Sequence, residues 1–280
     1  MKLSILMPYH NESFEKIKST FDSLNEQIDV DFNSIEIVIS NNCEKPNEPI
    51  EIYKAYPKLK DHIKYVLCKY IDNIGMSRQN AIDNASGDYF ICLDSDDVFP
   101  SNDVLKKYFS IMNQYSFDII YCRDSEQVPI NGKIKAITLA QSSKNVFVSG
   151  KLYRRDFIVK NNITFVPNIL YSEDTLFNLN CLIHNPCTGD ADFLAYTHVF
   201  NPDSITRKSS NAFLKTASED FIKGILWLVE QNKDSPHKKY IFNLITTSFN
   251  DFVTRIEDKF NIPVRDLAIE CYLKRLLNLE

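Results

Sequence analysis

Three carboxylates stand within four residues of one another at Asp94, Asp96 and Asp97, directly after the apolar run 89–93. Like charges this close repel and raise one another's pKa, so the group is costly unless a cation lies among them. Hard divalent ions prefer oxygen ligands, which aspartate supplies. The plainer interpretation is a solvated acidic turn ahead of a helix, which an isolated D-x-D-D pattern supports equally well. The elements that position the group decide between the two.

Strand and helix patterns alternate four times in about the first 95 residues, which predicts an α/β fold with a mostly parallel, doubly wound sheet. The expected strands are 3–7, 35–39, 63–67 and 88–93. Ligands of such sheets bind beyond the carboxyl ends of the strands. Three polar groups fall at those ends, namely His10-Asn11, Asn41-Asn42 and 94–97. Their convergence on one sheet edge is a stronger signal than any one of them.

The second half of the chain reads as mixed. Residues 117–122 predict a fifth strand, 124–138 a hairpin centred on Asn131-Gly132, and 193–200 a late strand. From Ser209 on, apolar stripes predict helices, including a third one after Pro263. The expected domains are one large α/β domain in two parts and a small C-terminal helical appendage. Their bounds are 1–207, with parts 1–123 and 124–207, and 208–280.

Charge and composition exclude some classes of protein. A net charge of -5 leaves no basic excess for a nucleic-acid partner. The seven cysteines are dispersed, with no C-x-x-C pair, which favours reduced thiols and a cytoplasmic location. No apolar run is long enough to span a bilayer, and the first residues do not form a signal peptide. Peripheral contact with the inner face of a membrane stays open.

Six segments, in this order and at these distances, resemble the family 2 glycosyltransferases, which have the GT-A fold. They are 4–11 (SILMPYHN), 73–80 (NIGMSRQN), 86–97 (SGDYFICLDSDD), 150–155 (GKLYRR), 172–177 (SEDTLF) and 196–207. The resemblance covers residues 1–207, and its motifs are specific as a set although each is weak alone. It implies a GT-A, Rossmann-like fold and inverting transfer of a sugar from a nucleotide sugar, usually a UDP-sugar, to an acceptor hydroxyl.

The resemblance also assigns roles to residues. A divalent metal, Mn²⁺ or Mg²⁺, would neutralise the leaving diphosphate, with Asp96 as its main ligand. Asp94 would contact the nucleotide and reach the metal through water, with Ser95 beside it on the donor. Arg78 would pair with the nucleotide or its phosphates. Asp174, with Glu173 beside it, is expected to be the base, facing the acidic group across the donor sugar.

The remaining assignments concern the nucleobase and the diphosphate. Pro8, Tyr9 and Asn11 would line the nucleobase pocket, where an aromatic ring can pack on uracil. Many relatives carry paired acidic residues where this chain has Asn41, so recognition of a base other than uracil stays open. His198 is a further candidate metal ligand, and Arg207 a candidate for the diphosphate.

Plainer interpretations stand beside these roles. Glu173 and Asp174 taken alone would be helix-capping residues, Tyr9 a core residue, and Arg78 a surface arginine. The string Asp94 to Val98 also fits a haloacid-dehalogenase-like phosphatase, although it follows the fourth strand and not the first. A nucleotidyltransferase would need a glycine-rich loop after the first strand. A non-catalytic carbohydrate-binding relative is a further alternative.

The acceptor and the C-terminal helices carry expectations of their own. The acceptor would be a glycan or glycopolymer, with a bacterial surface polysaccharide or wall polymer as the most common case in such families. The C-terminal apolar stripes favour a seam against the catalytic domain, ahead of a homo-oligomer contact and an acceptor platform.

Overall fold

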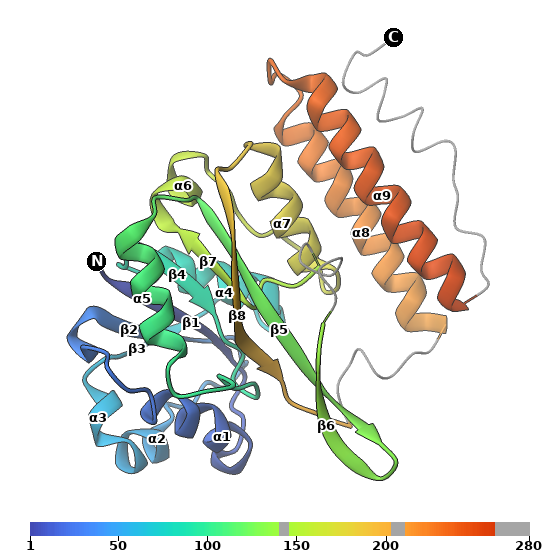
Figure 1. Ribbon diagram of the computed structural model, residues 1–280. Helices are drawn as coiled ribbons and strands as arrows, with labels where there is room; N and C mark the ends of the chain where they lie inside the picture. The colour runs from blue at the N-terminus through green and yellow to red at the C-terminus, as the bar shows by residue number, and fades with distance from the viewer. Residues whose placement is uncertain (140–145, 203–210, 261–280) are drawn as a thin grey trace.

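The computed structural model describes residues 1–139, 146–202 and 211–260. Within them the chain forms an eight-stranded sheet in the order β3-β2-β1-β4-β7-β5-β6, with β8 also paired to β5 (Figure 1). The strands are β1 (Leu3–Tyr9), β2 (Ile35–Asn41), β3 (Ile63–Leu67), β4 (Tyr89–Cys92), β5 (Ile119–Ile130), β6 (Lys133–Thr138), β7 (Lys151–Arg154) and β8 (Thr188–His198). The α-helices are α1 (Phe14–Asn25), α2 (Ile50–Ala55), α3 (Pro57–Lys60), α4 (Ile74–Asn84), α5 (Val104–Gln114), α6 (Arg155–Lys160), α7 (Glu173–Ile183), α8 (Asn211–Gln231) and α9 (Lys238–Phe260); a 3-10 turn spans Phe32–Ser34.

The first four strands are parallel to one another. β1 pairs with β2 and β4, and β2 pairs with β3. All residues of β1 are buried, because a central parallel strand has helices over both of its faces. Tyr9 lies opposite Asn41 in the ladder, and the acidic loop 94–97 follows β4. The predicted convergence of three polar groups on one sheet edge is therefore observed.

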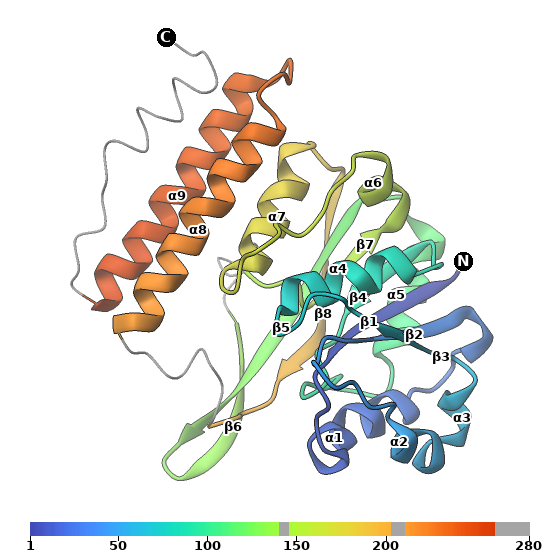
Figure 2. The ribbon, with the colours of Figure 1, turned by 180° about the vertical axis from the view of Figure 1, so that it is seen from behind.

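Two apolar cores cover the two faces of this sheet. The first is built from β1 residues of odd number and from α1, α2, α3 and α5, with Phe21 and Tyr108 among its fully buried side chains. The second contains Leu6 and joins the opposite face to α4, α6 and α7 through Ile82, Ile158 and Phe177. The two views show these helices on opposite sides of the sheet (Figure 1, Figure 2). The expected fold class is confirmed.

The sheet becomes mixed beyond β4. β7 lies between β4 and β5 and is antiparallel to both, whereas β8 runs parallel to β5 with a register shift near Arg123. The sequence pattern predicts no strand at β7, since four residues are too few to show a period. Because β7 lies inside the sheet, its first residue, Lys151, is buried and only 3% exposed.

A long hairpin extends from the body of the molecule. β5 and β6 pair antiparallel around Asn131 and Gly132, both of which have positive φ, 52° and 73°. That combination suits a two-residue hairpin turn, so the predicted hairpin is confirmed. β5 is longer than expected and runs without a break from the core into the hairpin, which projects beyond the sheet (Figure 1).

The helices α8 and α9 form an antiparallel pair against α7 (Figure 1, Figure 2). Their apolar stripes, with Phe221, Ile225 and Ile245, share a third core with Leu176 and Leu179 of α7. The predicted seam against the catalytic domain is thus observed. The third predicted helix after Pro263 and the domain boundary at 207 lie outside the described residues. Among those that are described, no helix is long and apolar enough to cross a membrane.

Candidate active site

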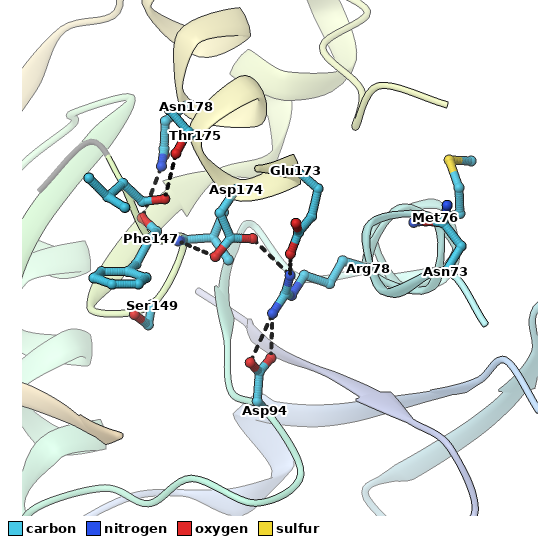
Figure 3. Close-up of polar contacts among 12 residues, drawn as sticks. Asn73, Met76, Arg78, Asp94, Phe147, Ser149, Glu173, Asp174, Thr175 and Asn178 are labelled. Carbon is cyan, nitrogen blue, oxygen red and sulfur yellow. Dashed lines mark hydrogen bonds and ion pairs between the residues drawn. The ribbon is translucent and has the colours of Figure 1, made fainter. Parts of the chain in front are cut away.

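Arg78, Asp94, Glu173 and Asp174 form one ion-pair network at the carboxyl end of β4, the Arg78 cluster (Figure 3). Arg78 Nη2 donates to both oxygens of Asp94 at 2.8 Å. Its Nη1 donates to Glu173 Oε1 at 3.0 Å and to Asp174 Oδ1 at 2.8 Å. The Arg78 side chain is only 4% exposed. The structure therefore brings Asp174 and the acidic group together, with the arginine between them.

Three local features place these side chains. Arg78 lies in α4, whose N-terminus is capped by the Asn73 side chain accepting from the Met76 N–H at 2.9 Å. Gly75 allows α7 to approach α4 closely, because a Cβ at Gly75 would stand 3.1 Å from Glu173 Cβ. Glu173 itself opens α7, so its carboxylate and the next one lie in the first turn, which the helix dipole favours.

Burial governs the electrostatics of the Arg78 cluster. Loss of water lowers the pKa of Arg78, but Asp174, Asp94 and Glu173 outweigh this and raise it well above its usual value. Burial also raises the pKa of both Glu173 and Asp174, with Arg78 opposing the shift. Because the effect of burial outweighs that of Arg78, each of these carboxylates binds a proton more tightly than it would in water.

The segment 146–148 fixes Asp174 from the other side. The Val148 N–H donates to Asp174 Oδ2 at 3.1 Å, so both oxygens of this carboxylate have a partner. Side chains of α7 bind the two carbonyls that precede Val148. Thr175 Oγ1 donates to Val146 O at 3.3 Å, and Asn178 Nδ2 donates to Phe147 O at 2.9 Å. The geometry leaves little freedom to the Asp174 carboxylate.

Lys151 is a functional candidate to which the sequence motifs assigned no role, although it lies in the segment 150–155. Its ammonium donates to Phe147 O. Burial lowers the pKa of Lys151 to about 8, while the charges of Asp124 and Asp174 oppose the shift. Its place in the motif 150–155 was the available signal, and a buried lysine usually has a charged partner.

The acidic loop separates into two environments. Asp97 is buried, accepting from the Tyr196 hydroxyl at 2.6 Å and the Val199 N–H at 2.7 Å, and so ties the loop to β8. Asp96 is exposed and forms no ion pair with any side chain that the structure describes. Partial desolvation and the charges of Asp97 and Asp94 raise the pKa of Asp96 to about 6.

A divalent cation fits the chemistry of Asp96 and Asp94. Within the described ranges, no three His, Cys, Asp or Glu side chains gather closely enough to hold a metal by themselves. Such a full set is not required in nucleotide enzymes, where one or two carboxylates and the substrate phosphates commonly bind the ion. Desolvation and then the charges of Asp97 and Asp94 raise the pKa of Asp96, and a bound cation would offset these effects. Asp94 would contribute as the second carboxylate, while keeping Arg78 as its partner.

His198, the third predicted metal ligand, is engaged by protein groups. Its Nδ1 lies 3.4 Å from Asp97 Oδ2, and its Nε2 lies 3.3 Å from Ser149 Oγ and 3.9 Å from Asp124 Oδ2. Burial lowers the pKa of His198, but the bonds to Asp124 and Asp97 raise it to about 10. Binding a metal would require this imidazolium to lose a proton and a partner, so that role stays a prediction.

Replacing His198 with glutamine is expected to remove a pH-dependent part of the stability. A folded-state pKa near 10, above the ordinary 6.5, gives stabilisation that is complete below pH 6.5 and lost as the pH rises through 10. The difference in unfolding free energy between wild type and His198→Gln should be about 1–3 kcal/mol near pH 6 and should shrink toward pH 10. Urea unfolding at several pH values measures it.

The titration of Lys151 also makes stability depend on pH, but it does not disturb that comparison. Its lowered pKa of about 8 makes stability rise with pH between 8 and 10.5, opposite in sign to the His198 effect. Both proteins contain Lys151, so its contribution cancels in the difference. A gap between the two proteins that stays constant from pH 6 to 10 would mean that His198 is neutral in the fold.

The residues predicted for the nucleobase form a second group, apart from the Arg78 cluster. Asn41 is 1% exposed; its Nδ2 donates to Asn11 Oδ1 at 2.7 Å and to the Tyr65 hydroxyl at 2.9 Å, and its Oδ1 accepts from the Cys43 N–H at 2.8 Å. Asn11 also accepts from the Asn47 N–H at 3.0 Å. The two amides therefore organise the loop after β2.

The other predicted donor residues are mostly interior. Tyr9 is 6% exposed within the first core, and burial raises its pKa to about 12. Pro8 is buried in β1, and Ser95 is buried with its carbonyl accepting from Thr20 Oγ1 at 2.7 Å. Arg207 lies outside the described residues. Contacts of these residues with a nucleotide stay predictions.

The chain is similar in sequence to curated glycosyltransferases. The chain is 28% identical over 197 residues to Poly(ribitol-phosphate) beta-glucosyltransferase of Bacillus spizizenii, which is 65% of this chain and 30% of that protein. It is 26% identical over 223 residues to the uncharacterized glycosyltransferase EpsJ of Bacillus subtilis, 73% of this chain and 62% of that one. The chain spans less than two thirds of the length of either relative.

Solved structures share the fold. TarS 1–349 of S. aureus in complex with UDP-GlcNAc superposes with a TM-score of 0.62 at 17% identity, over 99% of this chain and 88% of that one. The mannosyltransferase PcManGT of Pyrobaculum calidifontis, solved with GDP-Man and Mn²⁺, gives 0.56 at 11% identity, over 99% and 80%. The model of the family described as Glycosyl transferase family 2 matches residues 4–167, more than half of the chain. This protein is a glycosyltransferase and belongs to glycosyl transferase family 2.

Proposed function

We propose that this glycosyltransferase moves a sugar from a UDP-sugar to an acceptor hydroxyl with inversion at the anomeric carbon. The observation that carries the proposal is the Arg78 cluster, which fixes a half-buried carboxylate of α7 beside the loop that follows β4. That loop lies at the carboxyl edge of the parallel strands, where α/β sheets bind their ligands. Glycosyl transfer needs a base and a diphosphate site close together, and the nearness of Asp174 to the loop 94–97 supports this assignment.

Asp174 is proposed as the base. It takes the proton of the acceptor hydroxyl while that oxygen attacks the anomeric carbon from the face opposite the diphosphate. The bond between the anomeric carbon and the diphosphate oxygen breaks, and its electron pair leaves with the nucleoside diphosphate. Arg78 and the Val148 N–H hold one oxygen each, so the remaining lone pairs keep a fixed direction. Glu173, bonded to the same guanidinium, supports Asp174.

A divalent cation, Mn²⁺ or Mg²⁺, would stabilise the negative charge that develops on the leaving diphosphate. Asp96 would hold it, with Asp94 on its other side. Arg78 then has a second task, since it fixes both carboxylate oxygens of Asp94 while Asp94 faces the donor. The phosphatase alternative is disfavoured because the family match assigns this chain to glycosyltransferases.

The choice of UDP rests on relatives, and one of them differs. TarS is solved with UDP-GlcNAc and with UDP, whereas PcManGT is solved with GDP-Man. In this chain the Asn41 amide is fully used inside the protein. We therefore assign Asn41 to shaping the loop 43–47 beside the nucleobase.

The acceptor is proposed to be a bacterial wall glycopolymer or surface polysaccharide. The support is the likeness to a poly(ribitol-phosphate) glucosyltransferase and to TarS. A cytoplasmic location, at or near the inner face of the membrane, completes the proposal. It agrees with the cysteines that the structure describes, all of which are free thiols.

A donor screen tests the proposal. UDP-GlcNAc, UDP-glucose, UDP-galactose and GDP-mannose would each be incubated with the protein and Mn²⁺, and nucleotide release measured. We expect release from at least one UDP-sugar, its suppression by EDTA, and a loss of about 100-fold or more in Asp96→Ala. Asp83→Ala, at an α4 carboxylate bonded only to Gln79 in the described structure, serves as the control. Indifference to every UDP-sugar would overturn the donor assignment.

A further inference from the structure

The C-terminal helix α8 reaches the turn that leads into α7 through a buried carboxylate. Asp220 is 4% exposed, and its Oδ2 accepts from the backbone N–H of Leu170 at 2.9 Å and of Tyr171 at 3.2 Å. Lys223 lies 3.5 Å from its other oxygen but is itself 63% exposed. The strongest contacts of this charge are therefore made to the backbone of the catalytic domain, two and three residues before Glu173.

The turn that Asp220 holds depends on support from its surroundings. Ser172, the residue before α7, has φ 65° and makes no side-chain cap bond. Residues other than glycine keep such a left-handed conformation only where neighbouring groups fix it. Asn73 fixes the same turn from the donor side, because its Nδ2 donates to Ile169 O at 3.0 Å. A change of backbone angles at Ser172 would swing Asp174 away from Arg78.

A second contact braces the other side of the base. Gly224 lies one turn after Asp220 in α8 and packs on Leu176, which follows Asp174 by two residues. A Cβ at Gly224 would stand 2.2 Å from Leu176 Cδ1, and Leu176 is fully buried in the third core. α8, which lies alongside α7 (Figure 1), therefore contacts the chain just before and just after Asp174.

We infer that Asp220 is a positioning residue for proton transfer, and that α8 and α9 belong to the catalytic unit as the brace of the base. The inference rests on the proposed role of Asp174. Asp220 touches no reacting atom in this arrangement. It acts through the backbone at 170–171, which sets the direction of the first turn of α7.

The test uses the full chain with UDP-GlcNAc, Mn²⁺ and water as acceptor. We expect Asp220→Ala to lower kcat by about 10–100-fold while the donor Kd, from calorimetry, changes less than about 2-fold. Asp220→Asn keeps an oxygen that can accept both N–H groups, so it should retain kcat within about 3-fold. Glu230→Ala is the matched control, because Glu230 lies near the end of α8 and forms an exposed ion pair with Lys233. Its kcat should equal that of wild type.

Hydrogen exchange separates positioning from general damage. In Asp220→Ala, amides of residues 169–176 should exchange faster while β1 and β4 keep their protection. A folded Asp220→Ala with wild-type kcat overturns the inference. If this variant does not fold, Gly224→Ala decides by the same measurements, and an unchanged kcat there overturns it too. If Asp174→Asn loses activity and Asp220→Ala keeps it, only the positioning role of Asp220 is rejected. If Asp174→Asn stays active, the proposed role of Asp174 as the base is rejected.

Discussion

Replacing Asp174 with asparagine is expected to lower the rate of sugar transfer by about 10²–10⁴-fold, the range that a positioned general base contributes. Asparagine keeps an oxygen for one of the partners, Arg78 or the Val148 N–H, so the fold around it should survive. It cannot take a proton. The measurement is kcat for nucleotide release, with the Kd of the UDP-sugar measured beside it and expected to change little.

Glu173→Gln is the matched comparison for that variant. Both carboxylates bind the same Arg78 nitrogen, and both lie in the first turn of α7. If Asp174 is the base, Glu173→Gln should lower kcat by about 10-fold or less, through weaker support of the cluster alone. The opposite ranking, with Glu173→Gln the more damaging, would transfer the role of base to Glu173.

The sequence could predict which residues converge, because parallel strands share one edge. Asp94 follows β4 and Asn41 ends β2, so their common location needed no knowledge of side-chain packing. The position of Asp174 was harder to predict, since its distance from that edge depends on how α7 crosses the sheet. The motif resemblance supplied that step, and the contact through Arg78 bears it out.

Alternation along β1 favours the plainer interpretation of Tyr9, that of a core residue. Leu3, Ile5, Met7 and Tyr9 share one face of the strand, and the first three are plainly core residues. Tyr9 therefore points into the first core, as the structure shows. Position at the end of a strand predicts nearness to the site, but the face of the strand decides whether a side chain reaches it.

Lys151 and Asp220 could not be predicted, for a different reason. Each stands near other charged residues in the sequence, so nothing there shows that it is buried. The partners that matter are distant: the charges of Asp124 and Asp174 for Lys151, and the backbone at 170–171 for Asp220. Patterns of local period carry no information about such pairs. A buried charge implies that a partner exists, and only the folded structure identifies that partner.

Replacing Arg78 with methionine is expected to destabilise the protein by about 3–5 kcal/mol, because it leaves three crowded carboxylates without their shared cation. Methionine matches the length of the buried stem, so the loss reports the charge more than the packing. Asp94, Glu173 and Asp174 are 27%, 14% and 18% exposed, too little for water to replace the guanidinium. Urea unfolding at pH 7.5 measures the effect.

The pH dependence of this variant identifies the cause. Without Arg78, the folded-state pKa values of Glu173 and Asp174 should rise further above their unfolded values. Such groups stabilise the folded state at low pH and lose that contribution as the pH rises, so the gap between wild type and Arg78→Met should narrow from pH 7.5 to pH 5. Arg154→Met, which breaks the Arg154–Asp118 pair away from the Arg78 cluster, should show little narrowing.

Arg78→Lys separates charge from geometry. A lysine supplies one compact charge but cannot donate through two separate arms to Asp94 on one side and to Glu173 and Asp174 on the other. We expect it to recover about half of the lost stability and little of the lost kcat. Full recovery of both by lysine would mean that the cluster needs only a positive charge. The close fit of one guanidinium to four carboxylate oxygens predicts the reverse, since each arm fixes a different part of the site.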